Sequence, residues 1–297
     1  MIDATTRLVG LIGWPVTHSL SPVMHNAAFD ALRMNWRYLP LPAARGSVAA
    51  AVRGLAALGF AGANVTVPHK SAVLESVDSL SDEARSIGAV NTLVVQRGED
   101  GGCEVRGHNT DVAGFGRSLE TAGVAVAGER VVVVGAGGSA RAIVRALLDA
   151  GAADIAVLAR RLDQAACIAD RSKDGEASRV RPIRLGPDSL IEATRSAALL
   201  VHATPVGMAP DVGSSIWPDD VPVPADLTVV DLVYGPRETR LLAQVRAAGG
   251  LALDGLDMLI AQGAESFRLW TDRDPPIDAM RRACKLQLQR TSQGGVR

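Results

Sequence analysis

A glycine-rich segment between two regular elements gives the clearest indication of chemistry in this sequence. The residues GAGGSA at 135–140 follow four valines at 131–134 and precede residues 141–148, where apolar side chains recur at helical spacing. A run of valines is typical of a buried parallel strand. Glycines after such a strand let the backbone approach a pyrophosphate, and the helix that follows offers free N–H groups and the positive end of its dipole. The segment therefore predicts a dinucleotide site, although an ordinary tight turn between strand and helix would use the same residues.

The end of the next predicted strand, residues 154–159, indicates which dinucleotide is bound. NAD enzymes usually carry an Asp or Glu there that accepts a hydrogen bond from the ribose 2′-hydroxyl. This chain has Arg160 and Arg161 instead. Two guanidinium groups suit a 2′-phosphate and gain little from a bare hydroxyl. The residues therefore favour NADP, unless the two arginines are merely solvated at the start of a helix.

A lysine and an aspartate in the first third of the chain are candidates for proton transfer. Lys70 follows the predicted strand 62–67, and Asp111 precedes the predicted helix 112–119. An enzyme with a nicotinamide cofactor needs a proton donor or acceptor beside the hydride site, and a carboxylate can orient an ammonium for that task. Each residue also has a simpler explanation, because a lysine at a strand end is usually solvated and Asp111 would suit the N-cap of its helix.

Hydroxyl and amide side chains are candidates for substrate binding. Ser19 and Ser21 precede a predicted helix at 22–32, where hydroxyls and free N–H groups can hold a carboxylate. Ser21 would equally serve as the N-cap before Pro22. Asn91 and Asn109 each precede a threonine, and asparagines at such positions often cap turns. Together with the lysine, these groups suit a small polyol acid.

Two α/β domains must position these residues. In the first third, predicted strands at 7–12, 36–41, 62–67, 91–95 and 103–105 alternate with helices at 22–32, 47–58 and 81–87, and residues 97–102 have the composition of a hairpin loop. Further strands near Val131, Ile155, Leu199 and Val229 alternate with helices, which predicts a Rossmann-type doubly wound parallel sheet. Helices at 256–269 and 276–288 follow that sheet and can pack back on the first domain. We therefore expect an N-terminal substrate domain at 1–111 with 256–297, an NADP-binding domain at 112–255, and a ligand cleft between them.

Composition limits the class of protein. A length of 297 residues with 47% hydrophobic residues suits two domains with real cores. The net charge of −1 offers no basic field for nucleic acid. Three scattered cysteines form neither a metal-ligand spacing nor a disulfide framework. With no signal-peptide pattern and no long uninterrupted apolar stretch, we expect a cytoplasmic protein without nucleic-acid, membrane or metal partners.

The chain resembles the shikimate dehydrogenase family from end to end. The resemblance rests on segments in the same order, at 13–26, 64–70, 88–92, 109–111, 135–140, 203–208, 231–236 and 257–262. An unrelated dehydrogenase would share only the glycine turn. The resemblance implies reversible NADPH-dependent reduction of 3-dehydroshikimate to shikimate, in the chorismate pathway to aromatic amino acids. The expected ligands are small molecules, and the expected assembly is a monomer or homodimer.

The resemblance also implies roles for individual residues. Lys70 and Asp111 are the implied catalytic pair, with Lys70 donating a proton to the alkoxide that forms as the hydride arrives. The implied substrate-binding residues are Ser19, Ser21, Thr66 and Tyr234 near the carboxylate, and Asn91, Asp111 and Gln262 at the ring hydroxyls. The implied cofactor-binding residues are Gly135, Gly137, Gly138, Ser139, Ala140, Arg160, Arg161, Thr204, Gly255 and Met258. Three histidines of the motifs, His18, His25 and His69, are expected to support loop structure.

The sequence departs from the family pattern at a few positions. The family often has Asn where this chain has Ala159 and His202, Thr where it has Arg161, and Arg where it has Gln164. These departures leave the contacts of the 2′-phosphate open.

Two alternative functions remain at this point. A quinate/shikimate dehydrogenase that uses NAD should carry an acidic residue at 159–161, and this chain has none there. A non-catalytic nucleotide-sensing homologue could dispense with Lys70 and Asp111, and both are present.

Overall fold

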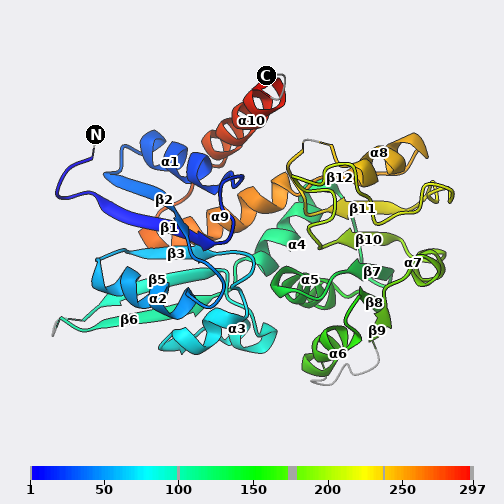
Figure 1. The fold of residues 1–297 in the computed structure, drawn as a ribbon, viewed down its shortest axis with the longest axis horizontal. Coiled ribbons are helices and arrows are strands. Elements are labelled where there is room, and N and C mark those ends of the chain that lie inside the picture. The colour runs from blue at the N-terminus through cyan, green and yellow to red at the C-terminus, as the bar shows by residue number, and fades with distance from the viewer. Residues whose placement is uncertain (1, 99–100, 173–178, 237, 295–297) are drawn as a thin grey trace. The chain divides into compact units, whose positions relative to one another are not determined.

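The computed structural model describes residues 2–98, 101–172, 179–236 and 238–294, and the chain forms two compact units (Figure 1). Unit 1 comprises Met1–Gly114 and Leu259–Arg297, and unit 2 comprises Phe115–Met258. The sequence places the two boundaries after residues 111 and 255, whereas they fall after Gly114 and Met258 in the structure. Each unit contains one six-stranded sheet with helices, so the predicted α/β class is confirmed.

Unit 1 is built on a mixed sheet. Its elements are β1 (Arg7–Gly13), α1 (Ser21–Ala31), β2 (Trp36–Pro42), α2 (Val48–Ala57), β3 (Gly62–Val65), the 3-10 helix η1 (Ala72–Ser76), β4 (Ser79–Leu80), α3 (Asp82–Ile87), β5 (Thr92–Arg97), β6 (Cys103–His108), the start of α4 (Asp111–Ala122), most of α9 (Leu256–Thr271) and α10 (Ile277–Gly294). The strand order is β2-β1-β3-β5-β6-β4. Strand β1 is parallel to β2 and β3, whereas β5 is antiparallel to both β3 and β6.

This topology brings four separate segments to one edge of the sheet. The carboxyl ends of β1, β3 and β6 and the start of β5 lie at the same edge, because Asn64 pairs with Thr92 and Thr92 pairs with His108. The segments that follow or precede these ends are residues 14–20, 66–71, 88–91 and 109–110. Most of the polar residues that the sequence analysis names in the first third of the chain lie in these segments or directly beside them, namely Ser19, Ser21, Thr66, Lys70, Asn91, Asn109 and Asp111. Active sites commonly collect at such strand ends.

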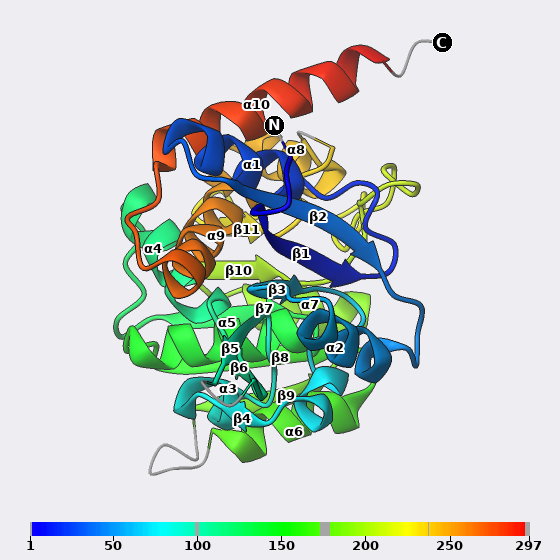
Figure 2. The same ribbon diagram turned by 90° about the vertical axis from the view of Figure 1, so that its left-hand side faces the viewer.

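Helices cover both faces of the first sheet. Val48, Val52 and Leu55 of α2 belong to one core cluster with strand residues that include Ile12 and Val65. On the other face, Phe29 of α1 stacks on Phe267 of α9 with ring centroids 5.3 Å apart. Figure 2 shows α1, α9 and α10 beside β1 and β2. Helix α10 and most of α9 therefore belong to unit 1 in the structure.

Unit 2 has the topology of a dinucleotide-binding sheet. Its elements are the remainder of α4, β7 (Arg130–Val134), α5 (Gly138–Asp149), β8 (Asp154–Ala159), α6 (Leu162–Arg171), β9 (Val180–Arg184), α7 (Pro187–Thr194), β10 (Leu199–His202), β11 (Thr228–Asp231), α8 (Arg240–Ala247), β12 (Ala252–Leu253) and the first residues of α9. All neighbouring strands are parallel, in the order β12-β11-β10-β7-β8-β9. The order reverses at β7, which is the switch point at which this fold binds dinucleotides. The Rossmann-type sheet is confirmed.

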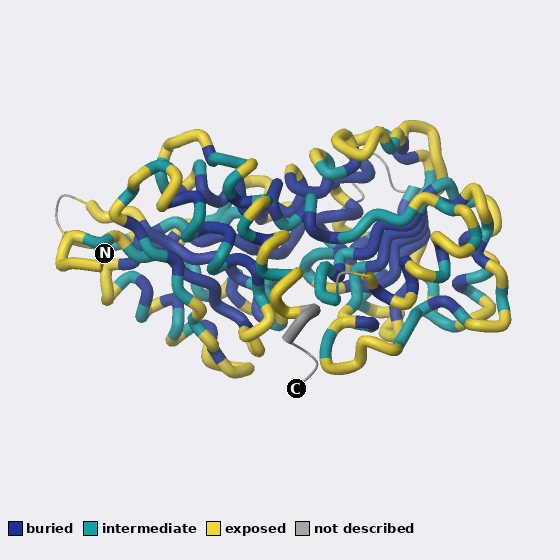
Figure 3. The backbone as a smooth tube through the Cα atoms, turned by 90° about the horizontal axis from the view of Figure 1, so that it is seen from above, coloured by how far each residue is buried: buried dark blue, intermediate teal, exposed yellow. Residues whose placement is uncertain are grey.

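Burial explains why the predicted strands form. Val131–Val134 are at most 1% exposed, as expected for a parallel strand covered on both faces. Figure 3 shows the strands of each unit as its most continuously buried part. Strand β9 and the short strands β4 and β12 are not predicted from the sequence. Strand β9 reads Val-Arg-Pro-Ile-Arg and has only one buried residue, and β4 and β12 have two residues each. The predicted hairpin is present as the antiparallel pair β5 and β6, and residues 99–100 of its loop lie outside the described residues.

Within the described ranges, the structure contains no helix with the length and apolar character needed to cross a bilayer.

Candidate active site

Lys70 and Asp111 form an ion pair at the strand edge of unit 1. Lys70 Nζ lies 2.5 Å from Asp111 Oδ2, and the two side chains are 13% and 4% exposed. The Lys70 carbonyl accepts the Val90 N–H at 2.8 Å, which ties the lysine backbone to the neighbouring segment. Asp111 is the first residue of α4, where the helix dipole favours a carboxylate. With so little solvent exposure, each charge of the pair is stabilised mainly by the other, because removal of either side chain leaves its partner's charge uncompensated.

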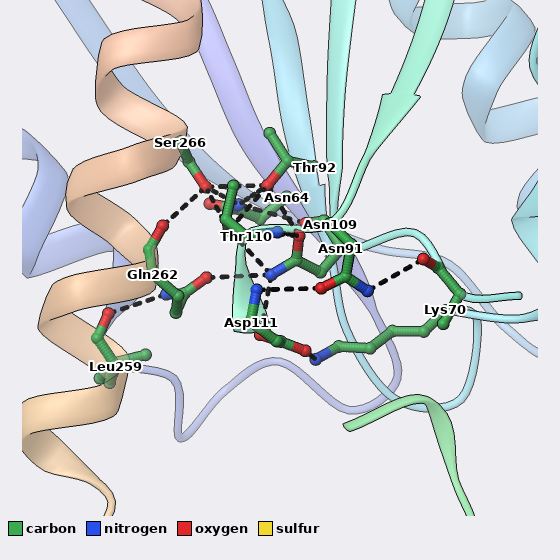
Figure 4. A network of polar contacts seen from close by, with 11 residues as sticks. Asn64, Lys70, Asn91, Thr92, Asn109, Thr110, Asp111, Leu259, Gln262 and Ser266 are labelled. Atoms are coloured by element: carbon green, nitrogen blue, oxygen red, sulfur yellow. Dashed lines mark hydrogen bonds and ion pairs between the residues drawn. The ribbon is translucent and has the colours of Figure 1, made fainter. Parts of the chain in front are cut away.

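The Asn91 carboxamide links this ion pair to the rest of the edge. Asn91 Nδ2 donates to Asp111 Oδ1 at 2.8 Å and lies 3.3 Å from Gln262 Oε1 (Figure 4). Asn91 Oδ1 accepts the Thr110 N–H at 2.7 Å. Each carboxylate oxygen of Asp111 therefore has its own partner, Lys70 or Asn91. The simple N-cap explanation for Asp111 is not what the structure shows.

Asn109 orients the start of α4. Its Oδ1 accepts the Asp111 N–H at 3.0 Å, and its Nδ2 donates to the Ala89 carbonyl at 2.9 Å. The expected turn-capping role of an asparagine is found here. By this contact Asn109 helps to fix the backbone of the aspartate that faces Lys70.

The network continues into residues to which the sequence analysis assigned no role. Asn64 Nδ2 lies 2.8 Å from Ser266 Oγ and 3.1 Å from Thr92 Oγ1, and Asn64 Oδ1 accepts the Tyr38 hydroxyl proton at 2.9 Å. Ser266 is fully buried and lies one helical turn after Gln262 on α9. That i, i+4 spacing places both side chains on one face of the helix and is the one sequence signal that could have identified Ser266.

Ser19, Ser21 and Thr66 lie at the ends of two neighbouring strands. An ideal Cβ built on Gly13, the last residue of β1, would lie 2.3 Å from Thr66 Cγ2, so the segment after β1 passes directly beside Thr66. Ser19 Oγ accepts the Ser21 N–H at 3.2 Å.

The alternative of Ser21 as an N-cap is wrong. Helix α1 begins at Ser21 itself, Leu20 occupies the N-cap position, and there is no side-chain cap bond. The Ser21 side chain therefore does not close the helix end as the sequence alternative supposed.

The glycine turn of unit 2 fits a dinucleotide pyrophosphate. Gly135 has φ +124°, and a Cβ there would lie 2.7 Å from the Ala203 carbonyl oxygen, so only glycine is accommodated. A Cβ on Gly137 would meet nothing within 4 Å, which leaves open space beside the turn. Helix α5 follows without a side-chain cap bond, so its first N–H groups can bind an anion. Ser139 and Ala140 lie in this first turn.

Positive side chains gather at the end of the neighbouring strands. Arg160 and Arg161 follow β8, are exposed, and have no ion-pair partner among the residues that the structure describes. Arg184, at the end of β9, pairs in register with Ala159 and donates to the Arg160 carbonyl at 3.4 Å. Arginines without counter-charges attract an anion. Sequence reasoning missed Arg184 because it did not predict β9.

The other predicted cofactor contacts lie on the opposite side of β7. Thr204 follows β10. An ideal Cβ built on Gly135 would lie 3.3 Å from Thr204 Cγ2, so Thr204 lies directly beside the glycine turn. A Cβ on Gly255 would be 2.2 Å from the Leu232 carbonyl oxygen, so this close approach requires glycine. Met258 is a buried residue of α9 and the last residue of unit 2. Tyr234, which is predicted to bind substrate and not cofactor, follows β11.

Two of the motif histidines have structural roles, one of which differs from expectation. His69 Nε2 lies 2.8 Å from the Ala43 carbonyl oxygen and so joins two loops. His25 lies on helix α1, not in a loop, and stacks on Tyr38 with ring centroids 4.6 Å apart. Neither of its ring nitrogens has a hydrogen-bond partner in the described part of the chain. Burial disfavours the charged ring and lowers the pKa of His25 to about 3.

Models of three protein families match successive parts of this chain. They are the shikimate dehydrogenase substrate binding domain at residues 11–93, the shikimate / quinate 5-dehydrogenase family at 119–231, and the shikimate 5′-dehydrogenase C-terminal domain at 255–285. The shikimate dehydrogenase (NADP(+)) of Methanothermobacter thermautotrophicus is 44% identical over 98% of this chain and 100% of its own length. The chain belongs to the shikimate dehydrogenase family. The family and the class of enzyme, an oxidoreductase, are thus as the sequence predicts.

Solved structures agree with the family assignment. A shikimate dehydrogenase in complex with NADP⁺ superimposes with a TM-score of 0.86 and 34% identity, over 97% of this chain and 98% of that one. Quinate dehydrogenase from Corynebacterium glutamicum in complex with NAD has a TM-score of 0.82 and 34% identity, over 95% of this chain and 99% of that one. The shikimate dehydrogenase fold therefore occurs with either dinucleotide. Side chains, rather than the fold, must decide which cofactor and substrate this chain uses.

Proposed function

We propose that this protein interconverts 3-dehydroshikimate and shikimate with NADP(H). The observation that carries the proposal is the largely buried contact of 2.5 Å between Lys70 Nζ and Asp111 Oδ2. It lies within a polar network, in a chain that belongs to this family. An ammonium has three N–H donors, so a contact with Asp111 does not exhaust its capacity to bind a substrate oxygen. The network around it offers amides and hydroxyls suited to a polyol ring.

Residues of unit 1 bind and orient the substrate in this proposal. Ser19, Ser21 and Thr66 hold the carboxylate at the ends of β1 and β3, and the family resemblance implies Tyr234 as a further residue for this group. Asn91, Asp111 and Gln262 hold the ring hydroxyls. The carboxamide of Asn91 already contacts both Asp111 and Gln262. These groups are therefore oriented before substrate arrives, which reduces the entropy lost on binding.

Lys70 moves the proton. NADPH, when bound, supplies the hydride to the ketone carbon. Lys70 donates a proton to the ketone oxygen as negative charge develops there, and its own positive charge stabilises that charge in a site largely shielded from water. Asp111 keeps the ammonium in position. In the oxidising direction Lys70 accepts the proton from the substrate hydroxyl.

Arg160 and Arg161 select NADP in this proposal. Their guanidinium groups lack ion-pair partners in the described residues, and the carboxylate that would bind a ribose 2′-hydroxyl is absent from positions 159–161. Gly135, Gly137, Gly138, Ser139 and Ala140 bind the pyrophosphate, and Thr204, Gly255 and Met258 lie toward the nicotinamide. The proposal places the enzyme in the cytoplasm, as a monomer or homodimer, in the chorismate pathway.

Initial-rate assays with four pairs of substrate and cofactor test the proposal. Shikimate and quinate are each oxidised with NADP⁺ and with NAD⁺, and reduced cofactor is followed by absorbance. We expect the largest kcat/KM for shikimate with NADP⁺. A larger kcat/KM for quinate with NAD⁺ would assign the chain to the alternative enzyme. Dinucleotide binding without turnover of either substrate would identify a non-catalytic homologue.

A further inference from the structure

A buried histidine connects two strand ends of unit 2 to the hydroxyl of Thr204. His202 is the last residue of β10, and Asp231 is the last residue of β11. His202 Nδ1 lies 2.9 Å from Asp231 Oδ1, and His202 Nε2 lies 2.5 Å from Thr204 Oγ1. Both the histidine and the aspartate side chains are 1% exposed. The proposed mechanism gives neither of them a task.

The partners of Asp231 determine which histidine nitrogen carries the proton. Asp231 Oδ1 also accepts the Val233 N–H at 3.0 Å, and Oδ2 accepts the Thr239 hydroxyl proton at 2.6 Å. A carboxylate with these donors is an acceptor, so His202 Nδ1 donates to it. In the neutral ring Nε2 is then an acceptor, and it takes the Thr204 hydroxyl proton.

The remaining hydrogen-bond capacity of Thr204 follows from this arrangement. Its hydroxyl proton is directed to His202, and its oxygen accepts the Val206 N–H at 3.3 Å. A hydroxyl oxygen has two lone pairs, so one acceptor position is left. Thr204 is partly exposed, whereas His202 is not. Thr204 can thus offer a ligand an acceptor, but not a donor.

The strand order indicates which part of a dinucleotide lies near Thr204. Thr204 packs beside Gly135 of the glycine turn. Strand β10 lies on one side of β7, and β8, which leads into Arg160, lies on the other. A dinucleotide crosses the switch point of such a sheet with its pyrophosphate at the turn. If the 2′-phosphate lies at Arg160, the nicotinamide half lies over β10.

We propose that Asp231 and His202 are positioning residues that hold the Thr204 hydroxyl as a hydrogen-bond acceptor for the nicotinamide half of the cofactor. The groups it would accept from are a ribose hydroxyl or the carboxamide N–H. A phosphate oxygen is excluded, since it is itself an acceptor. The proposal rests on the proposed function, because it assumes that NADP binds at the glycine turn.

Binding measurements with two ligands separate this role from a structural one. Isothermal titration calorimetry gives the Kd of NADP⁺ and of adenosine 2′,5′-bisphosphate, which lacks the nicotinamide half. The variants are Thr204→Val, which keeps the shape but removes the hydroxyl, and His202→Asn, whose shorter amide no longer reaches Thr204. We expect each to weaken NADP⁺ binding about three- to tenfold, the size of one neutral hydrogen bond, and to leave bisphosphate binding unchanged.

Two further variants sharpen the test. Thr204→Ser keeps the acceptor and should bind NADP⁺ like the wild type. The double variant Thr204→Val with His202→Asn should lose no more than Thr204→Val alone, since both changes remove the same contact.

Equal weakening of both ligands, additive losses in the double variant, or an unchanged NADP⁺ Kd in folded Thr204→Val would each overturn the proposal. If His202→Asn does not fold, Thr204→Val and Thr204→Ser decide it alone. A wild-type protein that binds neither ligand would overturn the proposed function as well, whereas unaltered binding by Thr204→Val would overturn only this inference.

Discussion

The edge of unit 1 with Lys70, Asp111 and Asn91, proposed to bind substrate, differs from the edge of unit 2 with Arg160 and Arg161, proposed to bind the cofactor. We call them the substrate edge and the cofactor edge. At the substrate edge, Asp111 and Asn91 are buried, the Lys70 side chain is 13% exposed, and both Lys70 and Asn91 are hydrogen-bonded to Asp111. At the cofactor edge, Arg160 and Arg161 are exposed and have no ion-pair partner in the described residues. Buried charges must be paired within the protein, whereas water solvates exposed arginines until a phosphate binds to them. The substrate edge therefore holds its reactive side chains in fixed positions, whereas the cofactor edge attracts an anionic ligand by charge.

This difference predicts different consequences of mutation. A change at the substrate edge disturbs groups that depend on one another, so its effects should be large and non-additive. A change at the cofactor edge removes an independent contact, so its effect should be confined to one ligand.

The largest effect is expected at the ion pair of the substrate edge. Lys70→Ala should lower kcat by about 10²–10⁴, because it removes the proton donor and its positive charge. Asp111→Asn should also lower kcat, since a neutral amide holds the ammonium less well. The double variant should lose far less than the product of the two single losses, because the residues act as one unit.

Cofactor-saturated initial rates give kcat for these variants, with folding checked by thermal unfolding. Arg181→Ala, which breaks a partly exposed ion pair with Asp154 in unit 2, is the control and should keep wild-type kcat. Retention of more than about a tenth of wild-type kcat by Lys70→Ala would exclude Lys70 as the proton donor.

The second largest effect is expected for the two arginines of the cofactor edge. The double variant Arg160→Ala with Arg161→Ala should raise the NADP KM steeply, because each charge-assisted phosphate contact contributes about 1.5–3 kcal/mol. The KM for NAD and the KM for shikimate should change little. Arg195→Ala removes an exposed arginine that pairs with Glu192 and serves as the charge control. Equal loss of activity with NADP and with NAD would show that Arg160 and Arg161 do not bind the 2′-phosphate.

The two edges also differ in how far the sequence predicts them. The glycine turn and the arginines are local signals, because a strand, a turn and a helix follow one another along the chain. Lys70 and Asp111 were identified from motifs, but their contact joins segments 41 residues apart. Ser266 and Asn64 were not assigned roles, since their hydrogen bond spans 202 residues and depends on how α9 packs on the sheet. Burial and pairing of this kind are tertiary properties that periodicity does not encode.

A third prediction concerns His25 of unit 1, a buried side chain whose two ring nitrogens have no hydrogen-bond partner in the described residues. The pKa of His25 is about 3 in the folded state and about 6.5 when the ring is in water. Below pH 6.5 the unfolded chain binds a proton that the folded chain does not, so stability is lost as pH falls from about 6.5 toward 3. Each pH unit in this window costs about 1.4 kcal/mol.

Chemical denaturation between pH 4.5 and 8 of the wild type and His25→Phe measures this effect. Phe keeps a ring against Tyr38 and Trp270 but does not titrate. We expect the stability of the variant relative to the wild type to rise by roughly 2 kcal/mol from pH 8 to pH 5. Parallel stability curves over this range would show that His25 is not the titrating group.

The smallest effect is expected for Ser21, where the shikimate KM reports substrate binding and the thermal midpoint reports a contribution to helix stability. An N-cap serine replaced by alanine costs about 1 kcal/mol, but α1 has Leu20 at the N-cap position and no side-chain cap bond. Ser21→Ala should therefore leave the thermal midpoint close to that of the wild type and raise the KM for shikimate, with the NADP KM unchanged. Ser81→Ala is the matched control, because the Ser81 side chain does accept the Ala84 N–H at 3.2 Å as the cap of α3. That control should lower the midpoint and leave both KM values alone. If Ser21→Ala instead lowers the midpoint and spares the shikimate KM, the hydroxyl stabilises α1, and the carboxylate site at the end of β1 must be built from other groups.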